Sequence, residues 1–549
     1  MNNEKIEKRR QSIIYGALTG SLGIFICKFL GLIYVTPFDA MAGNDLVFYS
    51  DSYIIYEFLW SLSTSGIPYA ISALVAKYLI TEDYELALRV RKLSQRALFV
   101  IGILISIGVV LFSGLIVKID AGKQPLEYQM KLRTCLILLS GACFSVPMLS
   151  GYRAFYQGLR RFEIYSISQV LEQVVRICFL LGGGAIAVYV LHASSIWAVY
   201  FAIIAMTVSA LGTILYFLYQ DKKTMPELLE NAAKQERHSH RSNRDILFEI
   251  MMFSLPFLLQ SLLDHSFGLV NLGYVKPALE AYGYNRELTD RIFSIINFNT
   301  AKLTAIPSVL GAGFAGAMIP HMARAHAIHD ADQVNSNFWK SFTSSAFLSV
   351  PMVILMMLFS REIYFFMYGG RNLDLGSEIL ALSLMSFFGW ILMIISNPIL
   401  LALDMRWHSL ILFAVRLGVT IALTYPIVSH YAYRGLFVFE LCSYLFFTGI
   451  NWLLVKRKYG IKILPVLWTL GKEFFCCLPM VLAVLLLKQT GDVIEKGRIV
   501  TLIVSLLRGV VAGSLYIALA FALKLPQKIF GISAKETLDR VLRKLHLNH

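Results

Sequence analysis

Fourteen long apolar runs constrain this chain more than any other feature of its sequence. Each has the length of about 20 residues that a helix needs to cross a bilayer. The predicted spans cover residues 12–35, 47–76, 97–117, 134–152, 164–190, 195–219, 246–274, 293–322, 341–360, 378–403, 408–428, 435–455, 466–487 and 499–523. Only 15% of the residues are charged, against about a quarter in soluble proteins. The sequence therefore predicts an all-α, polytopic membrane helix bundle and excludes a soluble globular fold.

The basic residues between the spans predict the orientation of the chain. With a cytoplasmic N-terminus, the inner segments carry 31 Lys and Arg residues and the outer loops carry 13. The positive-inside rule then places both termini in the cytoplasm of a multi-pass protein of the cell membrane. The net charge of +15 belongs to loops that face a membrane surface, so we expect no nucleic-acid partner. The basic start leads into an apolar segment too long for a cleavable signal peptide.

The longest predicted inner loop divides the chain into two halves. Six spans precede it and six follow, and an even number of spans in each half implies a parallel repeat about an axis along the membrane normal. We therefore expect two pseudo-symmetric halves around a central cavity, in a 6+6+2 arrangement. The predicted parts are an N-terminal six-helix half at 1–220, a cytoplasmic linker at 221–245, a C-terminal six-helix half at 246–460, two additional transmembrane helices at 461–525 and a basic cytoplasmic tail helix at 526–549.

The segments outside the predicted spans leave little room for catalysis. None exceeds about 30 residues, which is too short for a nucleotide-binding domain, and the chain carries no phosphate-binding loop or hydrolase motif. The seven cysteines lie mostly within apolar runs and lack the spacing of a metal site. We therefore expect no enzyme activity, no metal and no bound cofactor, with Na⁺, H⁺ or the membrane potential as the source of any energetic coupling.

A few ionisable residues lie inside the predicted spans, where each costs a few kcal/mol unless it faces protein or water. Lys28 and Lys302 either extend their ammonium groups to the interface or face a cavity. Glu172 and Arg176 are four residues apart and can pair on one helix face.

Two acidic residues are further candidates for a coupling or cavity charge. Asp51 begins the second span, and Asp264 lies midway along the seventh. Asp264 is the preferred candidate for a coupling-ion or proton site, because an intramembrane acid in a transporter is a common proton or cation ligand.

Glycine and proline residues interrupt several spans and provide candidate hinges. Gly66 and Pro68 lie in the second span, Pro256 in the seventh and Pro307 in the eighth. Such residues free backbone carbonyl groups and permit bending, as expected of helices that rock between inward-open and outward-open states. Static kinks have the same sequence signature.

Several motifs resemble one family of membrane transporters. YSDSY at 49–53 and FLWSLSTSGIP at 58–68 resemble the second span of the stage V sporulation protein B and MurJ-type lipid II flippases. RAFYQG at 153–158 and SQVLEQVVR at 168–176 resemble the same branch. This branch is part of the multidrug/oligosaccharidyl-lipid/polysaccharide exporter superfamily, with which the predicted 6+6+2 plan agrees.

The resemblance implies roles for the two lysines. Lys302, five residues before Pro307, falls on a cationic position of the family's central cavity, and Lys28 takes the place of a first-span arginine. Lysine keeps the charge but lacks the bidentate fork of arginine that suits phosphate. The seventh span has Asn271 where relatives place an acid, which leaves sodium coupling open.

The function that the resemblance implies is transport of a polyprenyl-diphosphate-linked glycan across the cytoplasmic membrane by alternating access. Lipid II, the peptidoglycan precursor, is the expected substrate, and membrane lipids are the expected surroundings. The last two spans are expected to line a groove for the lipid tail. The alternatives are a flippase for another lipid-linked polysaccharide repeat unit and a cation-coupled drug exporter of the same superfamily.

Overall fold

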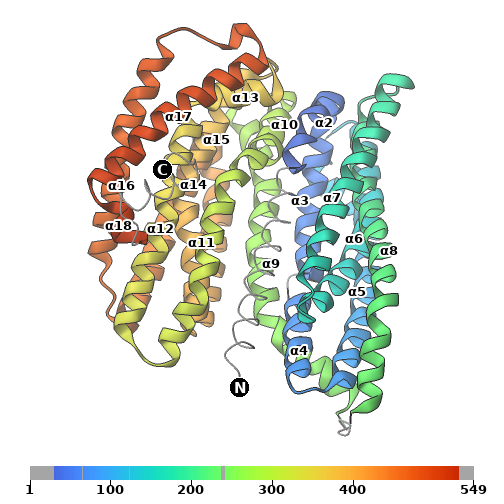
Figure 1. Ribbon diagram of the computed structural model, residues 1–549. Helices are drawn as coiled ribbons and strands as arrows, with labels where there is room; N and C mark the ends of the chain where they lie inside the picture. Colours follow the sequence, from blue (N-terminus) through green and yellow to red (C-terminus); the bar gives the residue numbers. More distant parts are fainter. Residues whose placement is uncertain (1–26, 28–29, 65, 123, 236–240, 531–549) are drawn as a thin grey trace, which may run out of the picture. The chain divides into compact units, whose positions relative to one another are not determined.

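The computed structural model describes residues 27, 30–64, 66–122, 124–235 and 241–530. Within these ranges the side chains of residue 63 and residues 308–320 are not described. The described residues form helices and connecting turns, with no β-strand among them (Figure 1). The all-α fold predicted from the apolar runs is confirmed.

The chain divides into two compact units, of which the first ends at Lys276 and the second begins at Pro277. The helices of unit 1 are α2 (Val35–Ala42), α3 (Leu46–Thr64), α4 (Ile67–Ile80), α5 (Tyr84–Ala121), α6 (Leu126–Gly158), α7 (Phe162–Ala185), α8 (Ile196–Lys234) and most of α9 (Asn243–Tyr282). Helix α6 is central to this unit, because it packs against α3, α4, α5, α7 and α8.

The helices of unit 2 follow the end of α9. They are α10 (Arg286–Ser294), α11 (Ala301–Ala327), α12 (Ala331–Leu358), α13 (Ser360–Tyr368), α14 (Leu373–Ala402), α15 (Arg406–Tyr459), α16 (Ile463–Lys488), α17 (Arg498–Ala522) and α18 (Leu525–Phe530). Helices α12 and α14 pack against each other and against α11, α14 pairs with α15, and α16 packs against both α12 and α17. Buried aliphatic and aromatic side chains fill these contacts.

The helices agree well with the predicted spans. In the described part of the chain, 11 helical segments are long and apolar enough to cross a membrane. Each predicted span from the second onward coincides largely with described helix, with a break at Gly66 inside the second span, whereas the first, 12–35, lies mostly outside the described residues, as does the tail at 531–549. The two spans predicted at 408–428 and 435–455 share α15, which is kinked at Ala432 (φ 53°, ψ −154°). The grouping of spans into 6+6+2 remains a prediction.

Candidate functional site

A cluster of three charged side chains lies within the membrane helices of unit 1. Glu172 of α7 accepts contacts from two arginines, at 2.8 Å from a guanidinium nitrogen of Arg153 and at 2.5 Å from one of Arg176. The three side chains are 13–23% exposed, so they are mostly buried while part of each remains accessible. We call Arg153, Glu172 and Arg176 the cationic cluster, because two positive charges surround one negative charge.

Local structure explains how these residues meet. Arg153 lies near the end of α6, and a short turn at 159–161 returns the chain antiparallel into α7. Arg153 donates hydrogen bonds to the hydroxyl and carbonyl oxygens of Ser168, at 3.1 and 3.0 Å, one turn before Glu172. Glu172 and Arg176 then share one face of α7, four residues apart. The pairing of Glu172 with Arg176 that the spacing predicted is therefore present.

Several tyrosines lie near Arg176 of the cationic cluster. Tyr34, Tyr53 and Tyr56 lie within electrostatic range of Arg176, and the rings of Tyr49 and Tyr53 stack at 5.6 Å. Tyrosine combines an apolar ring with a hydroxyl group that can donate a hydrogen bond. The cluster is therefore a cationic site with hydroxyl donors nearby, which is a donor set suited to an oxyanion.

Of the two lysines predicted to bind substrate, the structure describes only Lys302. Lys28 lies outside the described residues. Cys27, which precedes it, lies within electrostatic range of Arg153, Glu172 and Arg176. Lys302 belongs to unit 2, near the start of α11, where it is partly buried and its Nζ lies 5.9 Å from the ring centroid of Phe298. A π-helical turn at Ile295–Thr300 precedes Lys302.

Asp51 belongs to a second, fully buried charged group in unit 1. Its carboxylate lies 2.5 Å from Nζ of Lys276, and the two side chains are 0% and 1% exposed. Asp120 of α5 lies 3.9 Å from the same ammonium group. The group joins α3, α5 and α9 at the end of α9 that is remote from residues 221–245.

Asp264, the preferred coupling site, is exposed on α9. The next residue, His265, has its Nδ1 2.8 Å from the carbonyl oxygen of Ser261 and its ring 6.0 Å from that of Trp60. In the part of the chain that the structure describes, no group of three or more His, Cys, Asp or Glu residues could hold a metal ion.

One predicted hinge coincides with a break between helices. Gly66 separates α3 from α4, and Pro68 occupies the first turn of α4. A Cβ atom on Gly66 would lie 2.4 Å from the carbonyl oxygen of Ser254 on α9. The backbone at Gly66 therefore lies against the backbone of α9 at Ser254, and Ser254 is two residues before Pro256. Helix is continuous through Pro256 and Pro307.

Unit 2 also holds a buried arginine within a membrane helix. Arg416 of α15 is 6% exposed, and its guanidinium lies 4.3 Å from the ring centroid of Tyr444 and 3.3 Å from Oγ of Ser443. Glu440 lies within electrostatic range. Arg176 in unit 1 and Arg416 in unit 2 thus each lie near a glutamate inside a membrane helix.

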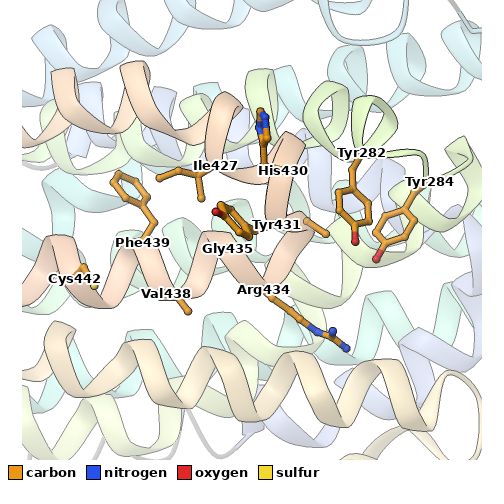
Figure 2. Close-up of a pocket in the computed structure, with 11 residues that line it drawn as sticks. Tyr282, Tyr284, Ile427, His430, Tyr431, Arg434, Gly435, Val438, Phe439 and Cys442 are labelled. Atoms are coloured by element: carbon orange, nitrogen blue, oxygen red, sulfur yellow. The ribbon is translucent and has the colours of Figure 1, made fainter.

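A cavity of about 680 Å³ opens beside the kink of α15 in unit 2. Its wall is mostly apolar and aromatic, with Tyr282 and Tyr284 on one side and the α15 residues Ile427 to Cys442 on the other (Figure 2). Arg434 is at the rim, where it contacts Glu378 at 2.5 Å. The cavity suits an apolar chain rather than a highly charged headgroup.

Three important residues were not identified from the sequence as site residues. Arg153 appears in the sequence only within a family-like motif, the predicted spans place Lys276 in an outer loop, and Glu473 of the thirteenth span is not among the predicted site residues. No sequence pattern identifies Arg153, because it lies on α6 and reaches Glu172 of α7 only when the two helices pack against each other. Glu473 carried a clear signal, because it is an acid within an apolar run.

Comparisons with solved structures show which fold the chain has. Among solved structures, the chain is similar to an inward-facing multidrug resistance MATE family transporter of the MOP superfamily, with a TM-score of 0.62 and 17% identity over 79% of this chain and 94% of that one. A MOP superfamily transporter from Pyrococcus furiosus matches with a TM-score of 0.58 and 16% identity, covering 82% of this chain and 95% of that one. The chain therefore has the fold of the MOP superfamily transporters.

Sequence comparisons show similarity to one described family and to two proteins of Bacillus subtilis. The family described as polysaccharide biosynthesis protein matches residues 14–271. The lipid II flippase MurJ of Bacillus subtilis is 23% identical over 532 residues, which is 94% of this chain and 97% of that protein. An uncharacterized membrane protein, YabM, of the same organism is 29% identical over 186 residues, 33% of this chain and 32% of that protein. The resemblance that the motifs indicated is confirmed.

Proposed function

We propose that this membrane protein is a flippase for a polyprenyl-diphosphate-linked glycan, with lipid II as its substrate. The observation that carries the proposal is the cationic cluster, which places two arginines beside one glutamate among membrane helices. The similarity to the Bacillus lipid II flippase along 94% of the chain supports the same function.

The chemistry of the cluster suits a diphosphate. Arginine presents a planar fork of donors that matches phosphate oxygens, and charge-assisted hydrogen bonds of this kind are stronger than neutral ones. Glu172 holds both forks in place before substrate arrives, which lowers the entropic cost of binding. In the proposed cycle Arg153 and Arg176 bind the diphosphate, and Lys28 and Lys302 keep the substrate-binding role that the resemblance implies for them.

Alternating access completes the proposal. The two six-helix halves rock about the substrate, the breaks at Gly66, Pro68, Pro256 and Pro307 permit bending, and the prenyl chain stays in lipid along the last two helices. The cycle uses no bound cofactor, and H⁺, Na⁺ or the membrane potential supplies the driving force. Both termini lie in the cytoplasm in this scheme.

The rival functions differ in substrate. A flippase for another lipid-linked repeat unit would use the same cluster with a different sugar. A drug exporter is supported by the fold it shares with the multidrug transporters, but the two arginines and two lysines would repel a cationic drug. Charge therefore favours an anionic substrate.

The test is flipping of fluorescent lipid II by the full chain in proteoliposomes. Wild type is compared with Lys28→Gln/Lys302→Gln, Arg153→Gln/Arg176→Gln and the exposed linker variant Lys234→Gln. We expect both double variants to lose flipping. The linker variant should flip at the wild-type rate. Absence of flipping by well-inserted wild-type protein would overturn lipid II as the substrate, and flipping of other polyprenyl-linked glycans or export of drugs would then identify the rival.

The driving force is tested in the same vesicles. Proton, sodium and voltage gradients are imposed one at a time, and Asp264→Asn is measured beside wild type. A rate that responds to one gradient and loses that response in Asp264→Asn would support the coupling role predicted for Asp264. An unchanged response would remove it.

A further inference from the structure

A buried acid in the C-terminal pair of long helices has no role in the proposed function. Glu473 lies near the middle of α16, and its side chain is 0% exposed. Neither carboxyl oxygen has a hydrogen-bond partner among the described residues. In the same part of the chain, no cation lies within electrostatic range of the carboxyl group.

Residues of three helices, α12, α16 and α17, lie around Glu473. One turn earlier on α16, Thr469 accepts a hydrogen bond from the indole nitrogen of Trp339 on α12, at 3.2 Å. One turn later, the thiol of Cys477 donates to the backbone carbonyl of Glu473. On α17, the Tyr516 hydroxyl group donates to the carbonyl oxygen of Phe347 on α12, at 2.8 Å. Helix α16 packs against α12 and α17 (Figure 1). The contacts of the residues one turn before and after Glu473 place it at this junction.

The titratable neighbours of Glu473 supply no positive charge. Tyr516 of α17 and Cys476 and Cys477 of α16 are the titratable groups in its range within the described residues. Lys472 is adjacent in sequence, but its ammonium group lies over the ring of Trp468, 5.6 Å from the centroid. By contrast, the buried carboxylate of Glu362 contacts Lys488 at 2.7 Å.

An ionised carboxylate in such a place would be costly. Removing one partner of a buried ion pair destabilises a protein strongly, because an uncompensated charge remains. A bound proton removes the charge and requires no additional space in these packed surroundings. We propose that Glu473 is a proton-binding site, and that loss of its proton is linked to separation of α16 or α17 from α12.

The proposal is independent of the substrate. The neutral acid is compatible with tight packing of α12, α16 and α17, whereas the carboxylate requires water or a cation. Deprotonation therefore favours an arrangement in which these helices admit water. This linkage makes the α16–α17 pair sensitive to protons whatever the transported lipid is.

Infrared spectroscopy of the full-length protein in nanodiscs tests the protonation state. The difference spectrum between wild type and Glu473→Gln at neutral pH should contain the C=O stretching band of a protonated carboxylic acid. Glu172→Gln serves as the matched control, and its difference spectrum should contain carboxylate bands, because Glu172 is paired with two arginines. Glu473→Leu provides a second variant if Glu473→Gln fails to fold. Carboxylate bands for Glu473 would overturn the proposal.

Hydrogen–deuterium exchange tests the linkage without a transport assay. Peptides from α16 and α17 are compared between wild type and Glu473→Gln at matched pH, so the intrinsic pH dependence of exchange cancels. We expect faster exchange in wild type than in the variant as the pH rises. Equal exchange at every pH would overturn the linkage, and neither readout depends on lipid flipping.

Discussion

The ammonium group of Lys276 and the carboxylate of Asp51 form a fully buried ion pair 2.5 Å apart. Lys276 is the last residue of unit 1 and lies on α9, whereas Asp51 lies on α3. At the other end of α9, Glu249 contacts Lys77 at 3.0 Å and Arg241 at 2.6 Å. Ion pairs near both ends thus attach α9 to unit 1.

Breaking the buried pair should destabilise the protein strongly. We expect Lys276→Met to cost about 3–5 kcal/mol, because Asp51 would remain buried without its counter-ion. The double variant Asp51→Asn/Lys276→Met should recover much of this loss, since it leaves no unpaired charge in the pair. Thermal unfolding followed by tryptophan fluorescence in detergent gives the comparison. Equal stability of the single variant and wild type would contradict the ion pair.

Lys276 also shows where sequence reasoning fails. The predicted seventh span ended at residue 274, because the lysine that follows is a normal signal for a loop. Helix α9 continues to Tyr282, and the lysine is buried because a partner on another helix neutralises it. A sequence pattern reports the charge but not the tertiary partner.

The close approach at Gly66 provides a second prediction. A methyl group there would meet the Ser254 carbonyl oxygen at 2.4 Å, which is within the repulsive range, so backbone must move. We expect Gly66→Ala to lower stability by about 1–3 kcal/mol, the usual cost of overpacking. Unfolding of the purified protein in a denaturant series measures the change.

Gly273→Ala is the matched control for this change. Gly273 lies on α9, and a Cβ atom there would meet nothing within 4 Å. Alanine is also the better helix former by about 1 kcal/mol, so this variant should be as stable as wild type or more stable. A similar loss in both variants would show that the contact with Ser254 is not the cause.

The kink of α15 gives a third prediction. Ala432 has φ 53° and ψ −154°, a conformation that costs a non-glycine residue about 1–3 kcal/mol. We therefore expect Ala432→Gly to raise the melting temperature. Ala422→Gly, on an exposed part of the same helix before the kink, should lower it, because glycine costs about 1 kcal/mol in a helix interior. A decrease in both variants would contradict the backbone conformation at Ala432.

The candidate site was only partly predictable. Apolar runs and charge clusters located the membrane helices, because burial in lipid imposes a strong and local pattern on the sequence. The Glu172–Arg176 pair was also local, since four residues bring two side chains to one helix face. Arg153 completes the cluster from a different helix, and only the packing of α6 against α7 brings it there.

The cationic cluster yields the last prediction, which concerns binding. Arg153→Gln and Arg176→Gln should each weaken binding of polyprenyl diphosphate about tenfold or more, since a hydrogen bond to a charged group contributes about 1.5–3 kcal/mol. Arg161→Gln is the control. Arg161 follows Arg153 by eight residues, but it pairs with Glu227 at 3.2 Å on the surface, where such pairs contribute about 0–1 kcal/mol. Its removal should leave the affinity unchanged.

In the same binding assay, the Glu172→Gln variant shows whether Glu172 acts by positioning the two arginines or by its negative charge. Removal of its negative charge leaves both arginines without a fixed counter-ion, so the net positive charge of the cluster increases while the alignment of the guanidinium groups is lost. If charge alone controls binding, the affinity should rise. We expect it to fall, because Glu172 contacts both guanidinium groups at 2.5–2.8 Å and holds them in one orientation. Titration of the detergent-solubilised protein with fluorescent polyprenyl diphosphate measures the dissociation constant, and tighter binding by the variant would show that Glu172 does not position the arginines for the diphosphate.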